Sequence, residues 1–240
     1  MNILCLCPTY GRPKHLLENT LACFENQTYD KTKRYLLMYD DLGNVLQQRG
    51  DRWEVLSTNE RAPCLSSKYN KLIDHTKKVG MPVDVLAVWD DDDLYLPGYL
   101  QELADSLGDR LWAHPEMVWS TYTGVPKLEP AAGRFHGSLA ITMELCYKIG
   151  GWPLGGRADF DQVMIQKCAA LGGQKADSGI NYVFRWQDTQ AMHCQGLMTD
   201  PSDTTWYKRV GVSEPSSIGL LEPTYDDGSA VVMSQLGIQV

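Results

Sequence analysis

The segment VDVLAVWDDDDLYLP, residues 83–97, joins a short apolar run to four consecutive aspartates. The apolar run is rich in β-branched residues and follows a glycine and a proline, which predicts a buried strand. Four carboxylates at the carboxyl end of such a strand repel one another, so a cation is expected to compensate them. A hard divalent ion with oxygen ligands suits this role, and the alternative is a solvated acidic turn. The flanking Trp89 and Tyr95 favour the shielded, metal-bound arrangement.

Strand and helix patterns alternate on both sides of this segment. The apolar spacing predicts strands at 3–7, 35–39, 53–56, 83–89, 117–122 and 182–186. It predicts helices at 13–26, 66–78, 99–107 and 162–171, with Ser66 or Ser67 as the cap of the second helix. This order predicts an α/β fold with a doubly wound, mostly parallel mixed sheet flanked by helices.

Polar segments follow three of the predicted strands. They are Thr9 to Arg12, Asp40 with Asp41, and Asp90 to Asp93. In doubly wound sheets, ligands bind at the carboxyl ends of the strands, near the point where the strand order reverses. We therefore expect these three segments to lie on one rim and to form a ligand site.

The composition narrows the class of protein. The chain of 240 residues has a formal charge of −8 and a pI near 5.1, which argues against a broad basic surface for nucleic acid or anionic membranes. No apolar stretch is long enough for a membrane span. The N-terminus lacks the basic region and the cleavage site of a secretory signal, so no such signal is expected. Seven cysteines without paired CxxC motifs favour a reducing cytoplasm and give no zinc signal.

Seven short motifs succeed one another along residues 2–195. They are CPTYGRP at 7–13, QTY at 27–29, YDDLGN at 39–44, SKYN at 67–70, WDDDDLYLP at 89–97, GGW at 150–152 and DFDQ at 159–162. This succession resembles the family-two glycosyltransferases, which have the GT-A fold and use nucleotide sugars. Two motifs depart from the family pattern, because Gly11 replaces the usual Asn and the tail of YDDLGN differs from DDGS.

The resemblance implies a domain organisation and a metal site. A GT-A domain would span 1–200, with a nucleotide-binding half at about 1–97 and an acceptor half at about 98–200. Residues 201–240 would form an extension docked on this domain. Mn²⁺ or Mg²⁺ would be the cofactor, with Asp92 as the direct ligand and Asp90 in support. His193 is a further candidate ligand, or else a surface histidine, and Asp93 is a candidate cap for the following helix.

The resemblance also implies a nucleotide site. Thr9 and Tyr10 would frame the base, and Asp40 or Asp41 would accept a hydrogen bond from its imide, unless this pair only forms a turn. Arg12 and Lys68 would neutralise phosphate charge, although Arg12 equally suits a solvated helix start. The complete predicted set is Pro8, Thr9, Tyr10, Arg12, Asp40, Asp41, Lys68 and Asp91, the last of which would face the ribose.

Transfer to a hydroxyl requires a general base on the far side of the sugar from the diphosphate. Asp159 and Asp161 are the candidates. Family members place an apolar and a basic residue three and six positions after the base, which fits Met164 and Lys167 after Asp161. Asp161 is therefore preferred, and Asp159 would cap the helix. A single base with direct attack implies inversion at the anomeric carbon.

Gly151 and Trp152 are candidates for contact with the acceptor or donor sugar, and a core position for Trp152 is the alternative. The donor would be a nucleoside diphosphate sugar, with UDP expected, and the acceptor a hydroxyl of unknown class. The acidic pI disfavours a nucleic-acid acceptor but leaves it open. Rival interpretations are a sugar-phosphate nucleotidyltransferase and a non-catalytic nucleotide-sugar-binding module.

Overall fold

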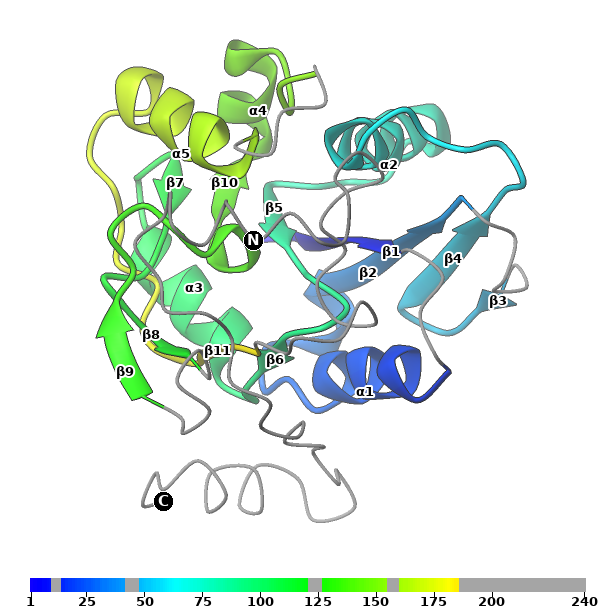
Figure 1. Cartoon of the computed structure of the whole chain (residues 1–240), viewed down its shortest axis with the longest axis horizontal. Helices are drawn as coiled ribbons and strands as arrows, with labels where there is room; N and C mark the ends of the chain where they lie inside the picture. The colour runs from blue at the N-terminus through cyan, green and yellow to red at the C-terminus, as the bar shows by residue number, and fades with distance from the viewer. Residues whose placement is uncertain (10–13, 42–47, 121–126, 155–159, 186–240) are drawn as a thin grey trace, which may run out of the picture.

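The computed structural model describes residues 1–9, 14–41, 48–120, 127–154 and 160–185, without the side chains of residues 14–16. Seven strands in these ranges form the main sheet: β1 (Ile3–Thr9), β2 (Arg34–Asp40), β3 (Gln48–Arg49), β4 (Trp53–Ser57), β5 (Val85–Val88), β7 (Trp112–Ala113) and β10 (Ala140–Thr142). Their order is β3-β4-β2-β1-β5-β10-β7 (Figure 1). The four central strands are parallel, whereas β3, β10 and β7 join antiparallel.

Strand β1 shows why this sheet needs a helical layer on each face. All seven of its residues are buried. Ile3, Cys5 and Cys7 pack in one apolar cluster and the alternating Leu4 and Leu6 in another. Because successive strand side chains point to opposite faces, both faces of the sheet must be covered.

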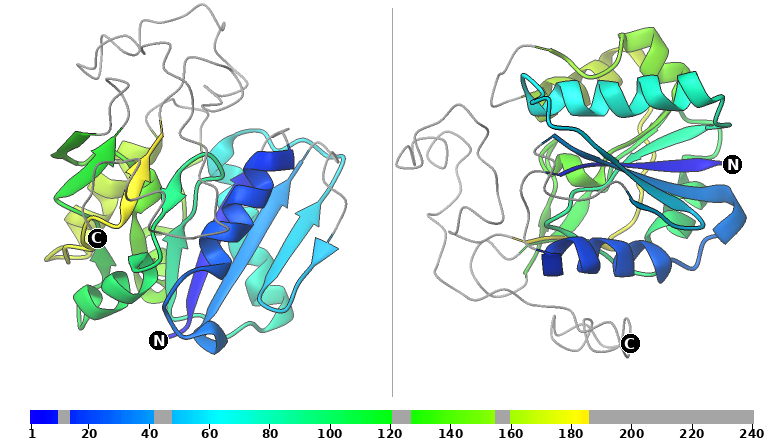
Figure 2. Two further views of the ribbon diagram at one scale, coloured as in Figure 1. Left: turned by 90° about the horizontal axis from the view of Figure 1, so that it is seen from below. Right: turned by 90° about the vertical axis from the view of Figure 1, so that its right-hand side faces the viewer.

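Helices of the described ranges cover both faces of the sheet (Figure 2). Residues of α1 (Lys14–Glu25) and α3 (Tyr99–Leu107) pack in the cluster that contains Cys5. Residues of α2 (Leu65–Val79), α4 (Met143–Ile149) and α5 (Phe160–Leu171) pack in the cluster that contains Leu6. Two short 3₁₀ helices, η1 (Lys31–Lys33) and η2 (His136–Ser138), lie in the connections.

A second, four-stranded sheet has the order β6-β11-β8-β9. Its strands are β6 (Leu94–Tyr95), β8 (Met117–Ser120), β9 (Lys127–Pro130) and β11 (Tyr182–Phe184). Strand β6 follows the four aspartates directly and pairs with β11, with Tyr95 opposite Tyr182. The second sheet therefore links the aspartate segment to the end of the described chain.

The prediction of a mixed, mostly parallel sheet flanked by helices is confirmed. Two expected helix caps are wrong. Cys64, not Ser66 or Ser67, is the N-cap of α2, and Ser67 instead completes a capping box from the third helical position. Gly98 is the N-cap of α3, five residues beyond Asp93, so Asp93 does not cap this helix.

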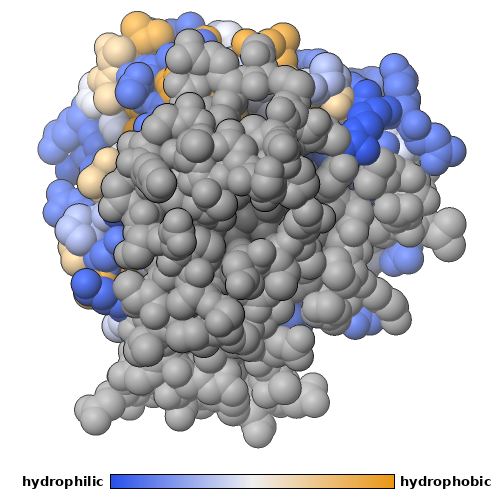
Figure 3. Space-filling model, viewed as in Figure 1, coloured by the Kyte–Doolittle hydropathy of each residue, from blue (hydrophilic) through white to orange (hydrophobic). Residues whose placement is uncertain are grey.

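Exposed apolar side chains of the described surface lie partly on the edge formed by α4 and α5 (Figure 3). Tyr147 of α4 is 54% exposed and Leu171 of α5 is 45% exposed. In the part of the chain that the structure describes, no helix has the length and apolar character to cross a membrane.

Candidate active site

The described parts of the three polar segments meet at one edge of the main sheet. Thr9 at the end of β1 pairs with Asp40 at the end of β2, and Leu6 pairs with Val88 at the end of β5. The aspartate loop, residues Asp90 to Asp93, therefore follows β5 at the same edge as Thr9 and Asp40. Tyr10 and Arg12 lie outside the described residues.

A buried ion pair joins the ends of β1 and β2. The Lys68 ammonium on α2 donates to Asp41 Oδ1 at 2.6 Å and to the Thr9 carbonyl oxygen at 2.7 Å. Both charged side chains are almost fully buried, at 2% and 0% exposed. The other oxygen of Asp41 accepts from the Ala62 amide at 2.9 Å. Asp41 and Lys68 thus bind to each other and to the protein backbone.

Tyrosine hydroxyls fix the start of the aspartate loop. Asp90 Oδ1 accepts from the Tyr69 hydroxyl at 3.0 Å. The Asp90 amide donates to the Tyr95 hydroxyl at 2.7 Å, and this hydroxyl donates to the Gly137 carbonyl oxygen at 2.9 Å. Burial raises the pKa of Tyr69 and Tyr95 well above the usual range, with a further contribution from the charge of Asp90. Both hydroxyls therefore keep their protons.

The end of the loop is held by β11 and the residue after it. Asp93 accepts from the Tyr182 hydroxyl and, through Oδ1, from the Arg185 amide at 2.9 Å. Burial raises the pKa of Asp93 well above its usual range, and the charges of Asp92 and Asp90 add to this rise. The carboxylates of this loop therefore repel one another, as the sequence predicts.

Hydrogen bonds to carbonyl oxygens fix the middle of the loop. Thr20 of α1 donates to the Asp91 carbonyl oxygen at 3.0 Å, and Arg185 Nε donates to the Asp92 carbonyl oxygen at 2.6 Å. The Asp91 and Asp92 residues are 2% and 5% exposed. Among the described residues, no group of three or more His, Cys, Asp or Glu is arranged to hold a metal ion. His193 lies outside the described part of the chain.

Helix η2 packs directly against the aspartate loop at Gly137. An ideal Cβ at this position would lie 2.6 Å from Asp90 Oδ2, 2.6 Å from the Tyr182 hydroxyl oxygen and 3.1 Å from Asp93 Oδ2. A side chain would displace these groups, so the close approach requires glycine. The preceding Phe135 has a φ of +62°, a strained value for a residue with a side chain.

Behind the loop lies an aromatic cluster formed by Tyr69, His136, Trp152 and Phe160. The Trp152 ring stacks on Tyr69 with centroids 4.9 Å apart and donates through Nε1 to His136 Nε2 at 2.9 Å. Burial lowers the pKa of His136 to about 3, so its ring is neutral. Trp152 is 1% exposed and lies in the core, the position that the sequence left open as the alternative to a sugar platform.

Asn70 fixes the turn that carries Gly151. Its side-chain amide donates to the Trp152 carbonyl oxygen and accepts from the Trp152 amide, both at 2.9 Å. Gly151 has a φ of +76°, and an ideal Cβ there would lie 2.7 Å from Asn70 Oδ1. The positive φ and the close approach of Asn70 therefore both require glycine at position 151.

Asp161 lies in the first turn of α5, half-buried, and its Oδ1 accepts from the Gln162 amide at 2.7 Å. The preceding Phe160 contacts the ring of His136, with centroids 5.4 Å apart, and that of Tyr69, at 6.5 Å. The aromatic cluster therefore places the start of α5 next to the residues that hold Asp90. Asp159 lies outside the described residues.

Sequence reasoning missed the residues that hold the aspartate loop. Tyr69 lies inside the SKYN motif, next to the predicted phosphate ligand Lys68, but tyrosine is also found in helix cores. Tyr182 and Arg185 are 89 and 92 positions from Asp93, so no local pattern links them to it. His136 has no motif around it at all.

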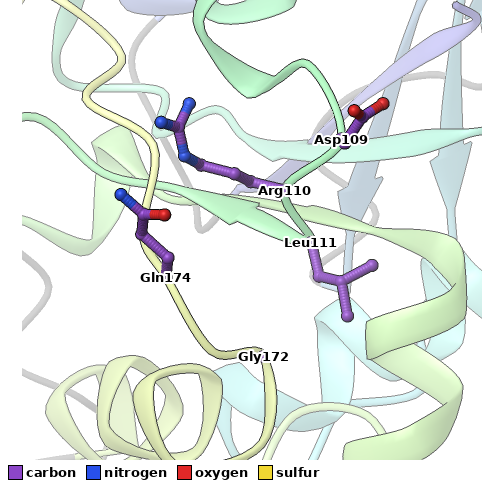
Figure 4. A pocket seen from close by; sticks show the side chains of 5 residues that line it. All are labelled: Asp109, Arg110, Leu111, Gly172 and Gln174. Atoms are coloured by element: carbon purple, nitrogen blue, oxygen red, sulfur yellow. The ribbon is translucent and has the colours of Figure 1, made fainter.

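A separate hollow of about 470 Å³ is lined by Asp109, Arg110, Leu111, Gly172 and Gln174. Figure 4 shows the Arg110 and Gln174 side chains close together and the Asp109 carboxylate pointing away from them. The Leu111 carbonyl oxygen accepts from the amide of Thr142, which pairs with Val85 at the start of β5. The hollow therefore lies toward the opposite edge of the sheet from the aspartate loop.

Solved structures resemble this fold at low sequence identity. S. aureus TarS 1–349 in complex with UDP matches with a TM-score of 0.58 at 14% identity, covering 78% of this chain and 61% of that chain. The same protein in complex with UDP-GlcNAc gives 0.56 at 15% identity, with 80% and 60% covered. A mannosyltransferase, PcManGT from Pyrobaculum calidifontis in complex with GDP-Man and Mn²⁺, gives 0.56 at 16% identity, with 90% and 66% covered.

These likenesses establish the fold, a mixed sheet flanked by helices as in GT-A glycosyltransferases. The chain spans 60% to 66% of the length of these structures. No protein-family model matches the chain, and a search of curated proteins also found no match.

Proposed function

We propose that this chain is a metal-dependent, inverting glycosyltransferase that moves a sugar from a nucleoside diphosphate sugar, with UDP preferred, to an acceptor hydroxyl. The observation that supports it best is the arrangement around Tyr69. This side chain contacts the aspartate loop through its hydroxyl and the start of α5 through its ring. The proposed donor site and the candidate base would then lie on two sides of one residue.

The aspartate loop is proposed to hold Mn²⁺ or Mg²⁺ through Asp92, with Asp90 in support. Carboxylate oxygens are the ligands that these ions prefer. Burial raises the pKa of Asp93, and the charges of Asp92 and Asp90, which a cation would offset, add to the rise. When bound, the ion would stabilise charge on the leaving diphosphate as a Lewis acid. His193 remains a candidate ligand from beyond the described residues.

On the nucleotide side, Asp91 is proposed to face the ribose and Asp40 the base, together with Pro8, Thr9 and Tyr10. The Thr9 hydroxyl is buried and has no hydrogen-bond partner within the described ranges, which suits a ligand contact. Because Lys68 and Asp41 already bind each other, we propose that this ion pair stabilises the ends of β1 and β2. Arg12 would then neutralise the charge of the phosphates. Gly151 is proposed to line the sugar site through its backbone.

Asp161 is proposed as the base that takes the proton of the attacking hydroxyl, with Asp159 supporting the helix start. Asp161 lies in the first turn of α5, and a carboxylate oxygen can take the proton of an attacking hydroxyl as a general base. Since no covalent intermediate is required, the product would have the inverted anomeric configuration.

The first test is calorimetric titration of the chain with UDP and GDP, with and without Mn²⁺, followed by a screen of nucleotide sugars for release of the free diphosphate. We expect Mn²⁺-dependent binding of one nucleotide and slow hydrolysis of its sugar conjugate. Pyrophosphate release from a nucleoside triphosphate and a sugar phosphate would replace the proposal with a nucleotidyltransferase. Nucleotide binding without turnover of any donor would favour the non-catalytic module.

The second test addresses the base. Asp161→Asn is expected to lower the transfer rate by about 10²- to 10⁴-fold while donor affinity stays within a few-fold of wild type. Asp159→Asn is expected to be milder, and Asp109→Asn, at the opposite edge of the sheet, is the control. If Asp159→Asn is inactive and Asp161→Asn is nearly normal, the roles are exchanged. If both variants turn over normally, the inverting mechanism is refuted.

A further inference from the structure

We infer that Tyr69 is a positioning residue that sets the orientation of the Asp90 carboxylate before any cation binds. The inference rests on the proposed function, because it assigns Asp90 to the support of a metal ion. Tyr69 would act through Asp90 and would not touch the substrate.

The contact with Asp90 is direct and shielded from solvent. Tyr69 is 0% exposed, and its hydroxyl lies 3.0 Å from Asp90 Oδ1. A hydrogen bond from a neutral donor to a carboxylate is charge-assisted and is therefore stronger than one between two neutral groups. It fixes one of the two Asp90 oxygens.

The hydroxyl cannot easily move, because the ring that carries it is packed from two directions. Trp152 stacks on the ring at 4.9 Å with an interplanar angle of 15°, and His136 approaches edge-on at 5.3 Å. These two neighbours bind each other through the Trp152 Nε1 hydrogen bond. Asn70 clamps the backbone of Trp152 from the same helix that carries Tyr69.

The other oxygen of Asp90 is confined by η2. Asp90 Oδ2 lies 2.6 Å from the position of an ideal Cβ on Gly137. The strained backbone of Phe135 leads into this approach, and such strain persists only where the surrounding structure holds it. One Asp90 oxygen therefore accepts a hydrogen bond from a hydroxyl, and the space beside the other is open only because residue 137 has no side chain.

Groups that hydrogen-bond a metal-supporting carboxylate orient it, and their loss typically costs about 10- to 100-fold in metal affinity or activity. A tyrosine with a purely structural role would affect stability alone. Tyr99 offers a matched comparison in the same core. It is 1% exposed and packs on Tyr95, yet its hydroxyl has no hydrogen-bond partner in the described part of the chain.

The test compares Tyr69→Phe with Tyr99→Phe. For each variant, the Mn²⁺ dissociation constant is measured by electron paramagnetic resonance in the presence of UDP, the free energy of unfolding by urea, and kcat and KM with the donor. We expect Tyr69→Phe to weaken Mn²⁺ binding about 10- to 100-fold and to lower kcat more than it raises KM for the donor. Tyr99→Phe should bind Mn²⁺ within twofold of wild type.

A second pair of variants tests the orientation of the Asp90 carboxylate from the side of Gly137. This test applies even if Tyr69→Phe fails to fold. Gly137→Ala places a methyl group against Asp90 Oδ2, and Gly98→Ala places one 3.0 Å from the side-chain nitrogen Nδ2 of Asn181, which can shift to accommodate it. We expect Gly137→Ala to lose Mn²⁺ affinity by a similar factor and Gly98→Ala to retain it.

Two outcomes separate this inference from the proposed function. If wild type binds Mn²⁺ with UDP and both Tyr69→Phe and Gly137→Ala bind it within twofold, the positioning role is refuted and the proposed function stands. If wild type binds neither Mn²⁺ nor any nucleotide, the proposed function fails and the inference fails with it.

Discussion

Two acidic segments follow parallel strands that flank β1, at one edge of the sheet, and the hydrogen-bond partners of the two segments differ. Asp41 after β2 forms a buried ion pair with Lys68 at 2.6 Å. The aspartate loop after β5 receives hydrogen bonds from the Tyr69 and Tyr182 hydroxyls and from the Arg185 amide. Asp41 is paired with a lysine ammonium, whereas the Asp90 and Asp93 carboxylates accept hydrogen bonds from neutral hydroxyls and a backbone amide. The Arg185 guanidinium binds the second segment at the Asp92 carbonyl oxygen.

The difference separates two kinds of acidic pair that look alike in the sequence. A buried ion pair is a fixed part of the structure, and its removal leaves an uncompensated charge. Carboxylates that accept hydrogen bonds from neutral donors are oriented without forming an ion pair, so they remain available to a cation, at the expense of self-repulsion. The predictions below test this distinction, and they run from the largest expected effect to the smallest.

Asp92→Asn should remove most activity while the fold is retained. The substitution preserves shape but deletes a charged ligand whose ion would contribute several kcal/mol to the transition state, so turnover is expected to fall on the order of 1000-fold. Steady-state kinetics at saturating Mn²⁺ measures this loss. The apo protein should unfold at an equal or higher urea concentration, because the change relieves repulsion in the loop. Near wild-type turnover would show that Asp92 is not a ligand.

Lys68→Met should destabilise the protein by about 3–5 kcal/mol, because it leaves Asp41 buried without its partner. Urea unfolding measures the change. The double variant Lys68→Met with Asp41→Asn removes both charges and should recover part of the loss. A loss below about 1 kcal/mol in the single variant would mean that the pair behaves as an ordinary surface ion pair.

Acid should weaken the region behind the aspartate loop through His136. Burial lowers its folded pKa to about 3, below the unfolded value near 6.5, so the unfolded state binds the proton first. Stability from the neutral ring is present above about pH 6.5 and is lost as the pH falls toward 3, by about 2 kcal/mol at pH 5. His136→Gln keeps an acceptor for Trp152 Nε1 and should flatten the difference in unfolding free energy between pH 7 and 5. His75→Gln, at a partly buried histidine of α2 that lies 4.0 Å from Glu54, is the control.

Asp93→Asn should have the smallest effect and the opposite sign. Its raised folded pKa means that the stability from the protonated form is present at low pH and is lost as the pH rises. The amide avoids the charged form, so at pH 7 the free energy of unfolding should rise or stay within about 1 kcal/mol of wild type. Any gain should disappear near pH 4. Asp41→Asn, which strips Lys68 of its partner, is the matched comparison and should destabilise at pH 7.

The sequence predicted the elements whose signal is local. Strands β1, β2, β4 and β5 are apolar runs between turn residues, and their order places Thr9, Asp40 and the aspartate loop at one edge. Two strands of the second sheet, β8 and β11, were predicted as well, but β6 has only two residues, too few for any periodicity. The same limit hid β3 and β7.

Partners of the predicted residues were not predictable for a different reason. The sequence marked Lys68 as a phosphate ligand because its type and place suit that role, but its burial and its ion pair with Asp41 arise from packing of α2 on the sheet. Likewise, the position of Asp93 just before a predicted helix suggested a helix cap. In the structure its carboxylate instead accepts hydrogen bonds from the distant Tyr182 and Arg185. Residue type indicates what a side chain can do, whereas tertiary contacts decide which of these options remain.

The hydrogen bonds to Asp93 also determine when the aspartate loop can form during folding. Tyr182 and Arg185 are separated from it by 89 and 92 positions, so this end of the aspartate loop cannot be completed on a growing chain until those residues have been made. Closing so long a segment is costly in entropy and is slow compared with forming local contacts. We expect β1, β2 and α2 to acquire protection first in pulse-labelling hydrogen exchange, and the Arg185 amide to acquire it last. Nucleotide binding would then appear only with that final phase of refolding.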